Sequence, residues 1–122
     1  MNVTEINTQR FKVALDLLRE GRPLTFDSVT YFLANEKILS VSIESSWELE
    51  NLTDDRALGD LQLAKSNFAY LLRNFEDFRV LVSGLQPSFH LVRDYGTGAV
   101  ELASLSEDAL VWNPFLKNKT IR

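Results

Sequence analysis

The middle of the chain repeats its apolar residues with the period of an α-helix for about six turns. The residues on this stripe are Leu58, Leu61, Ala64, Phe68, Leu71, Phe75 and Phe78. Acidic side chains at Asp54 and Asp55 favour a helix start there, because the helix dipole attracts negative charge. Gly59 weakens the first turn by up to about 1 kcal/mol, which leaves Asp60 as an alternative start. The spacing predicts a long helix over residues 55–78 with one apolar face.

A second helical pattern covers residues 8–20. Its apolar positions recur at three- and four-residue spacing, at Phe11, Ala14, Leu15 and Leu18. Asn7 or Thr8 can cap the start of this helix. Gly21 and Pro23 end it, because glycine tolerates the left-handed exit and proline cannot continue a helix.

The other patterned segments predict β-strands. Residues 38–44 alternate between apolar and polar side chains and are rich in β-branched residues. Residues 28–34 fit either a strand or one face of a helix, and the preferred prediction is a hairpin that turns at residues 34–37. Residues 79–83, with the sequence RVLVS, predict a short strand. The segment before Pro114 predicts either a turn of helix or another short strand.

A hairpin is predicted over residues 89–105, which contain the single histidine of the chain, His90. Two glycines near its middle suit a three-residue loop, because such loops need a residue with positive φ. This register places Arg93 directly opposite Glu101, which is a favourable pair of charges. A two-residue loop would instead place Asp94 opposite Glu101, and like charges in that position are destabilising. The charges therefore select the three-residue loop.

These elements predict one α+β domain over residues 1–122, with the order α-β-β-α-β-β-β. We expect an antiparallel sheet of about five strands, with the two main helices at residues 8–20 and 55–78 packed on one face. The chain is 122 residues long, 45% hydrophobic and 25% charged, which is normal for a single globular domain.

The composition argues against several classes of protein. The chain has no cysteine, which excludes disulfides, thiol catalysis and thiolate metal sites. No apolar run approaches the roughly 20 residues of a membrane helix, and the first residues lack the pattern of a signal peptide. The net charge of −4 argues against nucleic-acid binding, because phosphate contacts need clustered Lys and Arg. We expect a cytoplasmic protein without a cofactor.

The histidine hairpin does not predict a catalytic site. His90 and Asp94 lie four residues apart on one strand, which separates their backbones by about 13 Å. Ser88 is near His90 in the sequence and Ser104 is opposite it in the predicted pairing, but neither has the pattern of a nucleophile elbow. The sequence Gly-Thr-Gly without a following helix is not a phosphate-binding loop. We therefore interpret His90 as a structural or surface residue.

Residues 44–60 have the most unusual composition in the chain. The segment contains the six acids Glu44, Glu48, Glu50, Asp54, Asp55 and Asp60, against Arg56 alone. One interpretation is an acidic patch that attracts a basic partner, with Trp47 as the buried anchor. The other is a solvated loop that leads into a helix, with Trp47 folded into the core. No metal site is predicted, since adjacent helical side chains such as Asp54 and Asp55 point about 100° apart.

The pattern favours a protein-binding module over an enzyme. Small acidic α+β proteins include toxin-immunity proteins, so an immunity or inhibitor-type protein that binds a basic partner is the concrete form of this hypothesis. The predicted partner-binding residues are Trp47, Glu48, Glu50, Asp54 and Asp55. One alternative is a small-molecule-binding domain or a small enzyme with a pocket at His90, Arg93 and Tyr95. The other is a structural subunit that works as a homodimer.

Overall fold

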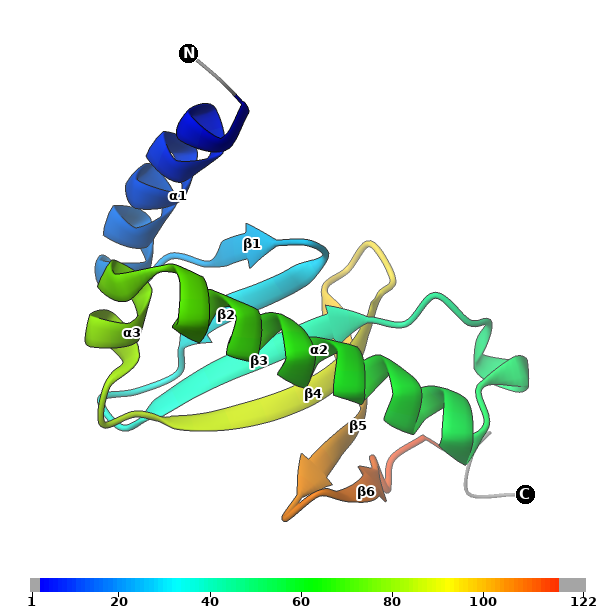
Figure 1. The fold of residues 1–122 in the computed structure, drawn as a ribbon. Coiled ribbons are helices and arrows are strands. Elements are labelled where there is room, and N and C mark those ends of the chain that lie inside the picture. Colours follow the sequence, from blue (N-terminus) through cyan, green and yellow to red (C-terminus); the bar gives the residue numbers. More distant parts are fainter. Residues whose placement is uncertain (1–2, 117–122) are drawn as a thin grey trace.

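The computed structural model describes the backbone of residues 3–116 and the side chains of residues 11–116. Helices and strands follow one another along this part of the chain (Figure 1). In order they are α1 (Val3–Arg19), β1 (Leu24–Phe26), β2 (Val29–Leu33), β3 (Ile38–Glu44), the 3-10 helix η1 (Leu49–Asn51), α2 (Asp54–Asn74), α3 (Glu76–Val82), β4 (Gln86–Asp94), β5 (Ala99–Ser106) and β6 (Ala109–Trp112). None of the helices within residues 3–116 is long and apolar enough to cross a membrane.

Six strands form one sheet, in which the strand order follows the chain order. Neighbouring strands are antiparallel except for β3 and β4, which are parallel and place Ser40 beside Ser88 and Ile43 beside Leu91. A parallel pair needs a crossover connection, and α2 and α3 provide it by running across one face of the sheet (Figure 1). This arrangement confirms the predicted α+β class, with six strands in place of about five.

The predicted helix over residues 55–78 is divided at Phe75, and the predicted strand over residues 79–83 is wrong. Phe75 has extended backbone angles, φ −131° and ψ 100°, and lies between α2 and α3. The bend allows Phe78 and Val82, four residues apart in α3, to point in one direction and become 0% and 5% exposed. A short apolar run fits a buried helix as well as a strand, so its spacing alone did not distinguish the two.

The ambiguous segment at residues 28–34 is a strand, which confirms the preferred hairpin. β2 pairs with β3 so that Val29 lies beside Ile43 and Leu33 lies beside Leu39. The backbone N–H of Ala34 donates to the carbonyl of Ile38 and closes the turn. The alternation of apolar residues in this pair therefore places one side of both strands in the core.

Two tight turns add the outer strands of the sheet, which are β1, a strand that was not predicted, and β6, where the prediction was either a turn of helix or a short strand. Asp27 and Ser28 join β1 to β2 with φ values of 50° and 68°. Glu107 and Asp108 join β5 to β6 with φ values of 51° and 68°. Two successive residues with positive φ are the geometry of a type I′ hairpin turn. Neither turn contains glycine, which is the strongest sequence signal for this geometry.

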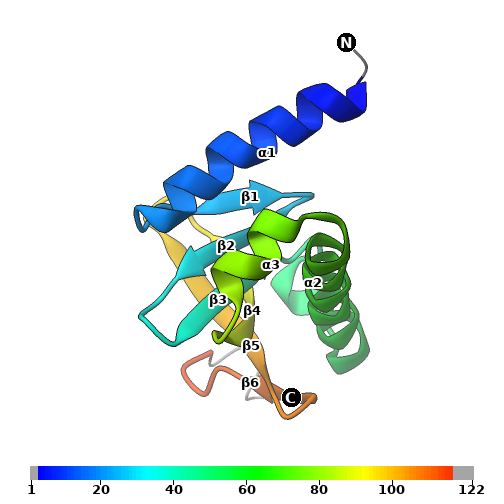
Figure 2. The same cartoon turned by 60° about the vertical axis from the view of Figure 1, so that its left-hand side comes forward.

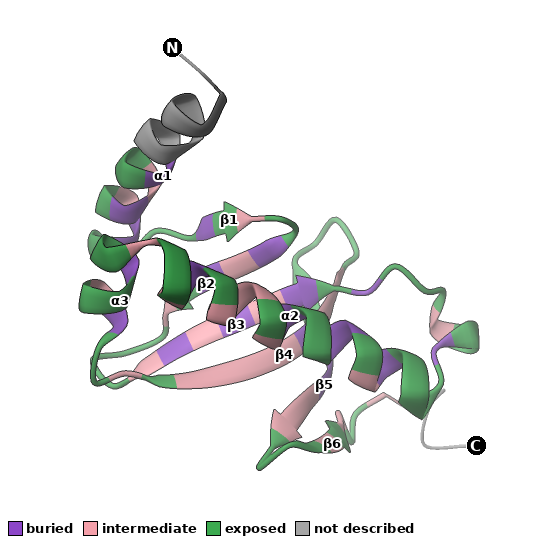
Figure 3. Cartoon of the chain, in the orientation of Figure 1, coloured by how far each residue is buried: buried purple, intermediate pink, exposed green. Residues whose placement is uncertain are grey.

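The core lies between the sheet and the helices, where the buried residues of Figure 3 concentrate. Its large, fully buried side chains are Tyr31, Phe78, Leu15, Leu18, Leu24, Leu39, Leu52, Leu61, Leu71, Leu91, Leu102 and Val29. Helix α1 lies over β1 and beside α3 (Figure 2). The ring of Phe11 in α1 is 4.1 Å from that of Phe75 and 5.7 Å from that of Phe26, measured between centroids. Aromatic packing therefore attaches α1 to both the sheet and α3.

The opposite face of the sheet carries mostly polar side chains. Strand pairing places Thr30, Ser42, His90 and Ser104 in a row across β2, β3, β4 and β5. Successive side chains of a strand point to opposite faces, so this row lies on the far side from the core residue Tyr31. We call this surface the open sheet face, because the described helices all pack on the other side (Figure 2).

Candidate functional site

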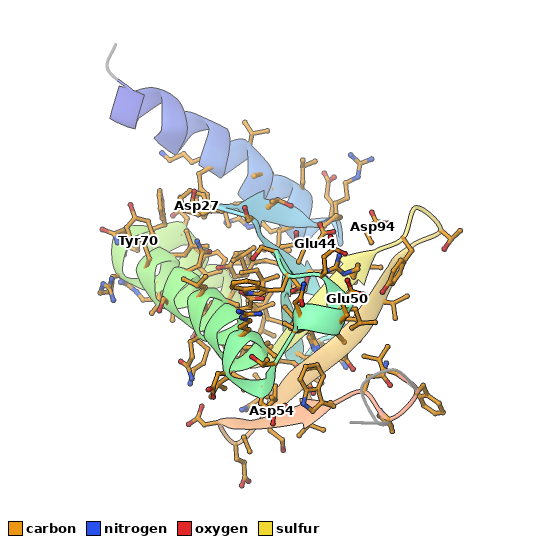
Figure 4. All side chains as sticks on the ribbon, turned by 90° about the vertical axis from the view of Figure 1, so that its right-hand side faces the viewer. Asp27, Glu44, Glu50, Asp54, Tyr70 and Asp94 are labelled. Carbon is orange, nitrogen blue, oxygen red and sulfur yellow. The ribbon has the colours of Figure 1, made fainter. Side chains whose placement is uncertain are left out.

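Acidic side chains gather at one end of the molecule, which Figure 4 views directly. They come from the β1–β2 turn, the ends of β3 and β4, the loop that contains η1, and the first turns of α2. The residues of this acidic end are Asp27, Glu44, Glu48, Glu50, Asp54, Asp55, Asp60 and Asp94. Parallel strands end at the same edge of a sheet, which brings Glu44 of β3 close to Asp94 of β4. The topology therefore extends the acidic segment of the sequence into a larger surface.

Ser45 fixes the loop that leaves the acidic end of β3. Its backbone N–H donates to the carbonyl of Val92 at 3.0 Å, which continues the pairing with β4. Its hydroxyl accepts a hydrogen bond from the backbone N–H of Trp47 at 3.2 Å and lies 3.3 Å from a carboxylate oxygen of Asp60. Because Ser45 is 6% exposed, these hydrogen bonds form away from solvent and hold the loop in one conformation.

Two arginines near the acidic end point towards the loop rather than towards the carboxylates. The guanidinium of Arg56 lies 4.0 Å from the centroid of the Trp47 ring, and its Nη1 donates to the carbonyl of Asn51 at 2.7 Å. Arg93 donates through Nη2 to the backbone carbonyl of Trp47. Both cations therefore fasten the Trp47 loop, and Trp47 itself stays 38% exposed.

Glu44, Glu48, Glu50 and Asp55 form no ion pair with the described side chains of residues 11–116. The ion pairs of this part of the chain join Arg19 to Asp16, Lys65 to Asp108, and His90 to Glu101. Asp54 has a different role, because its Oδ1 accepts a hydrogen bond of 2.7 Å from the indole Nε1 of Trp112 and ties α2 to β6. The residues without a described cationic partner therefore include Glu44, Glu48, Glu50 and Asp55.

A groove with a volume of about 550 Å³ opens at the acidic end between α2 and the β1–β2 turn. Its wall on α2 is made by residues spaced three and four apart, namely Asp60, Leu63, Ser66, Asn67 and Tyr70. Asp27 and Glu44 lie on the opposite side, together with the apolar side chains of Val29 and Ile43. We call this cavity the acidic groove. It combines apolar walls with three carboxyl groups.

Asp60 is the most buried acidic residue of the groove, with 7% of its surface exposed. Burial raises the pKa of its carboxyl group, because the charged form loses hydration, and the hydrogen bond from Ser45 partly opposes this shift. The neighbouring wall is also organised, since the hydroxyl of Tyr31 donates to Oδ1 of Asn67. Burial raises the pKa of Tyr31 and Asp27 adds to the effect, so Tyr31 remains a neutral donor.

The structure brings the predicted partner-binding residues together on the acidic end. Trp47, Glu48, Glu50 and Asp55 are exposed there, whereas Asp54 is engaged by Trp112. The sequence analysis missed the members of the surface that come from other segments, which are Asp27, Leu63, Tyr70 and Asp94. No local pattern marks these residues, because only the folded sheet and α2 place them beside the acidic segment.

The structure does not bring the alternative pocket residues together. His90 and Arg93 lie three positions apart on β4, so their side chains leave opposite faces of the sheet. His90 lies on the open sheet face, and Arg93 contacts the Trp47 loop. Tyr95 is in the loop after β4 and is 52% exposed. A single cavity lined by these three side chains is therefore not formed.

The histidine hairpin has a different register from the predicted one near its loop. His90 lies opposite Ser104 as expected, but a β-bulge follows Leu91, and Arg93 lies opposite Val100 instead of Glu101. Leu102, between Glu101 and Ala103, is the extra residue of the bulge. Leu102 is 0% exposed, so the bulge allows two successive residues of β5 to be buried. The predicted pair of Arg93 and Glu101 is therefore wrong.

Glu101 instead takes part in a hydrogen-bonded chain on the open sheet face. The Ser88 hydroxyl is 2.7 Å from Nε2 of His90, and Nδ1 of His90 contacts a carboxylate oxygen of Glu101. The same order of groups occurs in serine hydrolases, where backbone N–H groups also stabilise the oxyanion. Ser88 pairs with Ser40 of β3, and the pairing of β4 with β5 runs from His90 to Asp94. Since Ser88 and His90 are in β4 and Glu101 is in β5, these hydrogen bonds link the two strands.

Among the described residues, no group of three or more His, Asp and Glu side chains has an arrangement that could hold a metal ion. Comparisons with known proteins give no match, whether the chain is compared with protein-family models, with curated proteins or with solved structures. The candidate site is therefore defined by its own geometry and charge.

Proposed function

We propose that this protein is a cytoplasmic binding module that docks a basic protein partner through its acidic end, as an inhibitor or immunity-type protein does. The proposal rests on the observation that exposed carboxylates at this end are not neutralised by nearby cations among the described residues. Glu44, Glu48, Glu50 and Asp55 have no described cationic partner, while Arg56 and Arg93 are used to hold the Trp47 loop. Such a field attracts a basic surface and accelerates association.

The conformation of the Trp47 loop supports the proposal. Ser45, Arg56 and Arg93 hold the loop through hydrogen bonds and a cation–π contact before any partner binds. Less conformational freedom is then lost on association, which favours affinity. Trp47 is 38% exposed on this surface and provides an aromatic anchor of the kind that contributes strongly to interfaces.

The proposal is tested with two variants that remove the same amount of charge. The first is Glu48→Gln/Glu50→Gln/Asp55→Asn, which leaves the structural Asp54 intact. The second is Glu20→Gln/Glu36→Gln/Glu76→Gln, whose exposed acids lie outside the acidic end. Each protein is crosslinked in its source cells, and the captured partner is identified, purified and used for kinetic measurements.

We expect a partner with a basic surface to bind the wild type and the second variant with similar rates. The first variant should associate about tenfold more slowly at low salt, and its association rate should depend less on ionic strength. Equal association rates for the two variants, or a partner with an acidic surface, would contradict the proposal.

A further inference from the structure

We infer that the acidic groove is a lysine-binding subsite, which takes one lysine side chain of the protein partner and places its ammonium group on Asp60. This inference rests on the proposed function and specifies how the partner is recognised. The groove volume of about 550 Å³ lies within the range of ordinary ligand pockets. Its walls combine an apolar surface with carboxyl groups, which matches a side chain with an alkyl stem and a charged head.

Asp60 supplies the first argument. It is 7% exposed, it lines the groove, and Ser45 is the single donor to its carboxylate among the described side chains. That hydrogen bond is long, at 3.3 Å, and involves Oδ2, so Oδ1 has no described partner. A buried carboxylate with so little compensation is unfavourable. A cation that enters the groove would supply the missing interaction.

The surrounding groups supply the second argument. Leu63 of α2 is 60% exposed, and Tyr70, two turns later on the same side of the helix, is 43% exposed. These side chains do not complete the core, but they extend the apolar wall of the groove towards solvent. A four-carbon stem can pack along this wall while Asp27 and Glu44 on the opposite side add negative potential.

The number of free oxygens favours lysine over arginine. A guanidinium group binds a carboxylate best through two parallel hydrogen bonds, which need both oxygens. Ser45 contacts Oδ2 of Asp60, so a guanidinium that binds both oxygens would share Oδ2 with Ser45, whereas an ammonium group can bind Oδ1 alone. A compact ammonium group suits a single acceptor, so the site should prefer the lysine side chain.

The test uses the full chain labelled with ¹⁵N and three probes. The probes are a nine-residue oligolysine peptide, an oligoarginine peptide of the same length, and 1,5-diaminopentane. Amide signals of Leu63, Ser66 and Asn67 report on the groove, and those of Glu48 and Glu50 report on the loop. The variants are Asp60→Asn, the surface control Asp55→Asn, and Ser66→Trp, which fills the groove from an exposed position and leaves Asp60 intact.

We expect oligolysine to shift the groove signals of the wild type. Asp60→Asn should weaken this binding by about tenfold or more, because a partly buried charge pair is lost. Asp55→Asn should weaken it by less than about threefold, as expected for an exposed charge. Ser66→Trp should also weaken it by about tenfold, and a thermal unfolding curve like that of the wild type would show that this variant folds.

Each other result has a defined meaning. If oligolysine shifts only the loop signals and Asp60→Asn behaves like Asp55→Asn, the subsite is wrong and docking at the acidic end stands. If no signal of the acidic end shifts, both proposals fail. Oligoarginine binding as tightly as oligolysine would overturn the preference for lysine. Diaminopentane binding as tightly as the peptide would show a site for free amines instead of a protein side chain.

Discussion

The acidic end and the open sheet face are both polar, and both include residues of β3 and β4, yet their polar groups are used differently. On the open sheet face the polar groups contact one another, as in the chain from Ser88 through His90 to Glu101. At the acidic end, Glu48, Glu50 and other exposed carboxylates have no described cationic partner. A polar group that is satisfied within the fold contributes to the scaffold, whereas like charges left together favour an external partner.

The two regions also differ in how the chain holds them. The open sheet face belongs to the strands, and its side chains follow from strand alternation except at the bulge in β5. The acidic end includes the Trp47 loop, which Arg56 and Arg93 fasten, and the acidic groove beside α2. The contacts of Arg56 and Arg93 at the acidic end therefore stabilise an exposed charged loop and not the core.

The largest expected effect is the difference in the free energy of unfolding between a substitution on the buried side of α2 and one on its exposed side. Leu61 is 0% exposed and Leu63 is 60% exposed, although both are leucines of the same helix. Leu61→Ala should lower the free energy of unfolding by about 2–5 kcal/mol, because it leaves a cavity. Leu63→Ala should change it by less than about 0.5 kcal/mol. Urea denaturation measures both, and a large loss for Leu63→Ala would assign that residue to the core instead of the groove.

Asp60 should make folding less favourable as the pH rises. Its folded-state pKa is raised above the ordinary value of 3.8, so the native protein holds this proton to a higher pH than the unfolded chain does. The contribution to stability therefore falls from pH 3.8 up to the raised pKa. Asp60→Asn should be as stable as the wild type at pH 7, or more stable by up to about 1 kcal/mol.

Chemical denaturation of both proteins between pH 4 and pH 8 measures this difference. The advantage of Asp60→Asn should shrink as the pH falls, since both side chains are then neutral. An advantage of the wild type that grows with pH would show that the Asp60 carboxylate stabilises the fold, and the argument for an external cation would lose its basis.

The chain of Ser88, His90 and Glu101 should contribute to stability and not to catalysis. His90→Ala and Glu101→Gln should each lower the free energy of unfolding by about 0.5–1.5 kcal/mol. The double variant should lose less than the sum, because the two side chains share one contact. Phenylmethylsulfonyl fluoride should leave the mass of the protein unchanged. A covalent adduct on Ser88 would reveal an activated nucleophile and overturn the structural role.

A small effect is also expected from the contact between Arg56 and Trp47. Arg56→Ala should lower stability by about 0.5–1 kcal/mol, because it removes a partly exposed cation–π contact. The indole N–H signal of Trp47 should also broaden or move in the NMR spectrum as the loop gains freedom. Arg73→Ala, an exposed arginine near the end of α2, is the control. Equal changes in the Trp47 signal for both variants would show that Arg56 does not hold the loop.

The sequence predicted the parts of the fold whose apolar spacing is regular over several residues. These are the helix near the start, most of α2, strand β3 and the hairpin with β2. It did not predict the bend at Phe75, since the apolar stripe continues through it from α2 into α3. It also missed the bulge at Leu102, because the predicted pairing of Arg93 with Glu101 looked favourable while the burial of Leu102 decided the register.

For the candidate site, composition identified the acidic segment at residues 44–60 but left open whether Trp47 is an anchor for a partner or a core residue, and the structure leaves it 38% exposed. It did not find Asp27, Tyr70 or Asp94, because these residues come from separate segments and meet only through the topology of the sheet and α2. The groove is formed by residues from the β1–β2 turn, β2, β3 and α2, so no local sequence pattern predicts it.

The most direct test of the central claim places the same photo-crosslinking residue, p-benzoylphenylalanine, on each of the two regions. Ser66 lines the acidic groove, and Ser40 lies on the open sheet face. After irradiation in the source cells, the account predicts a crosslink from position 66 to a protein with a basic surface and none from position 40. A protein crosslinked from position 40 and not from position 66 would contradict it.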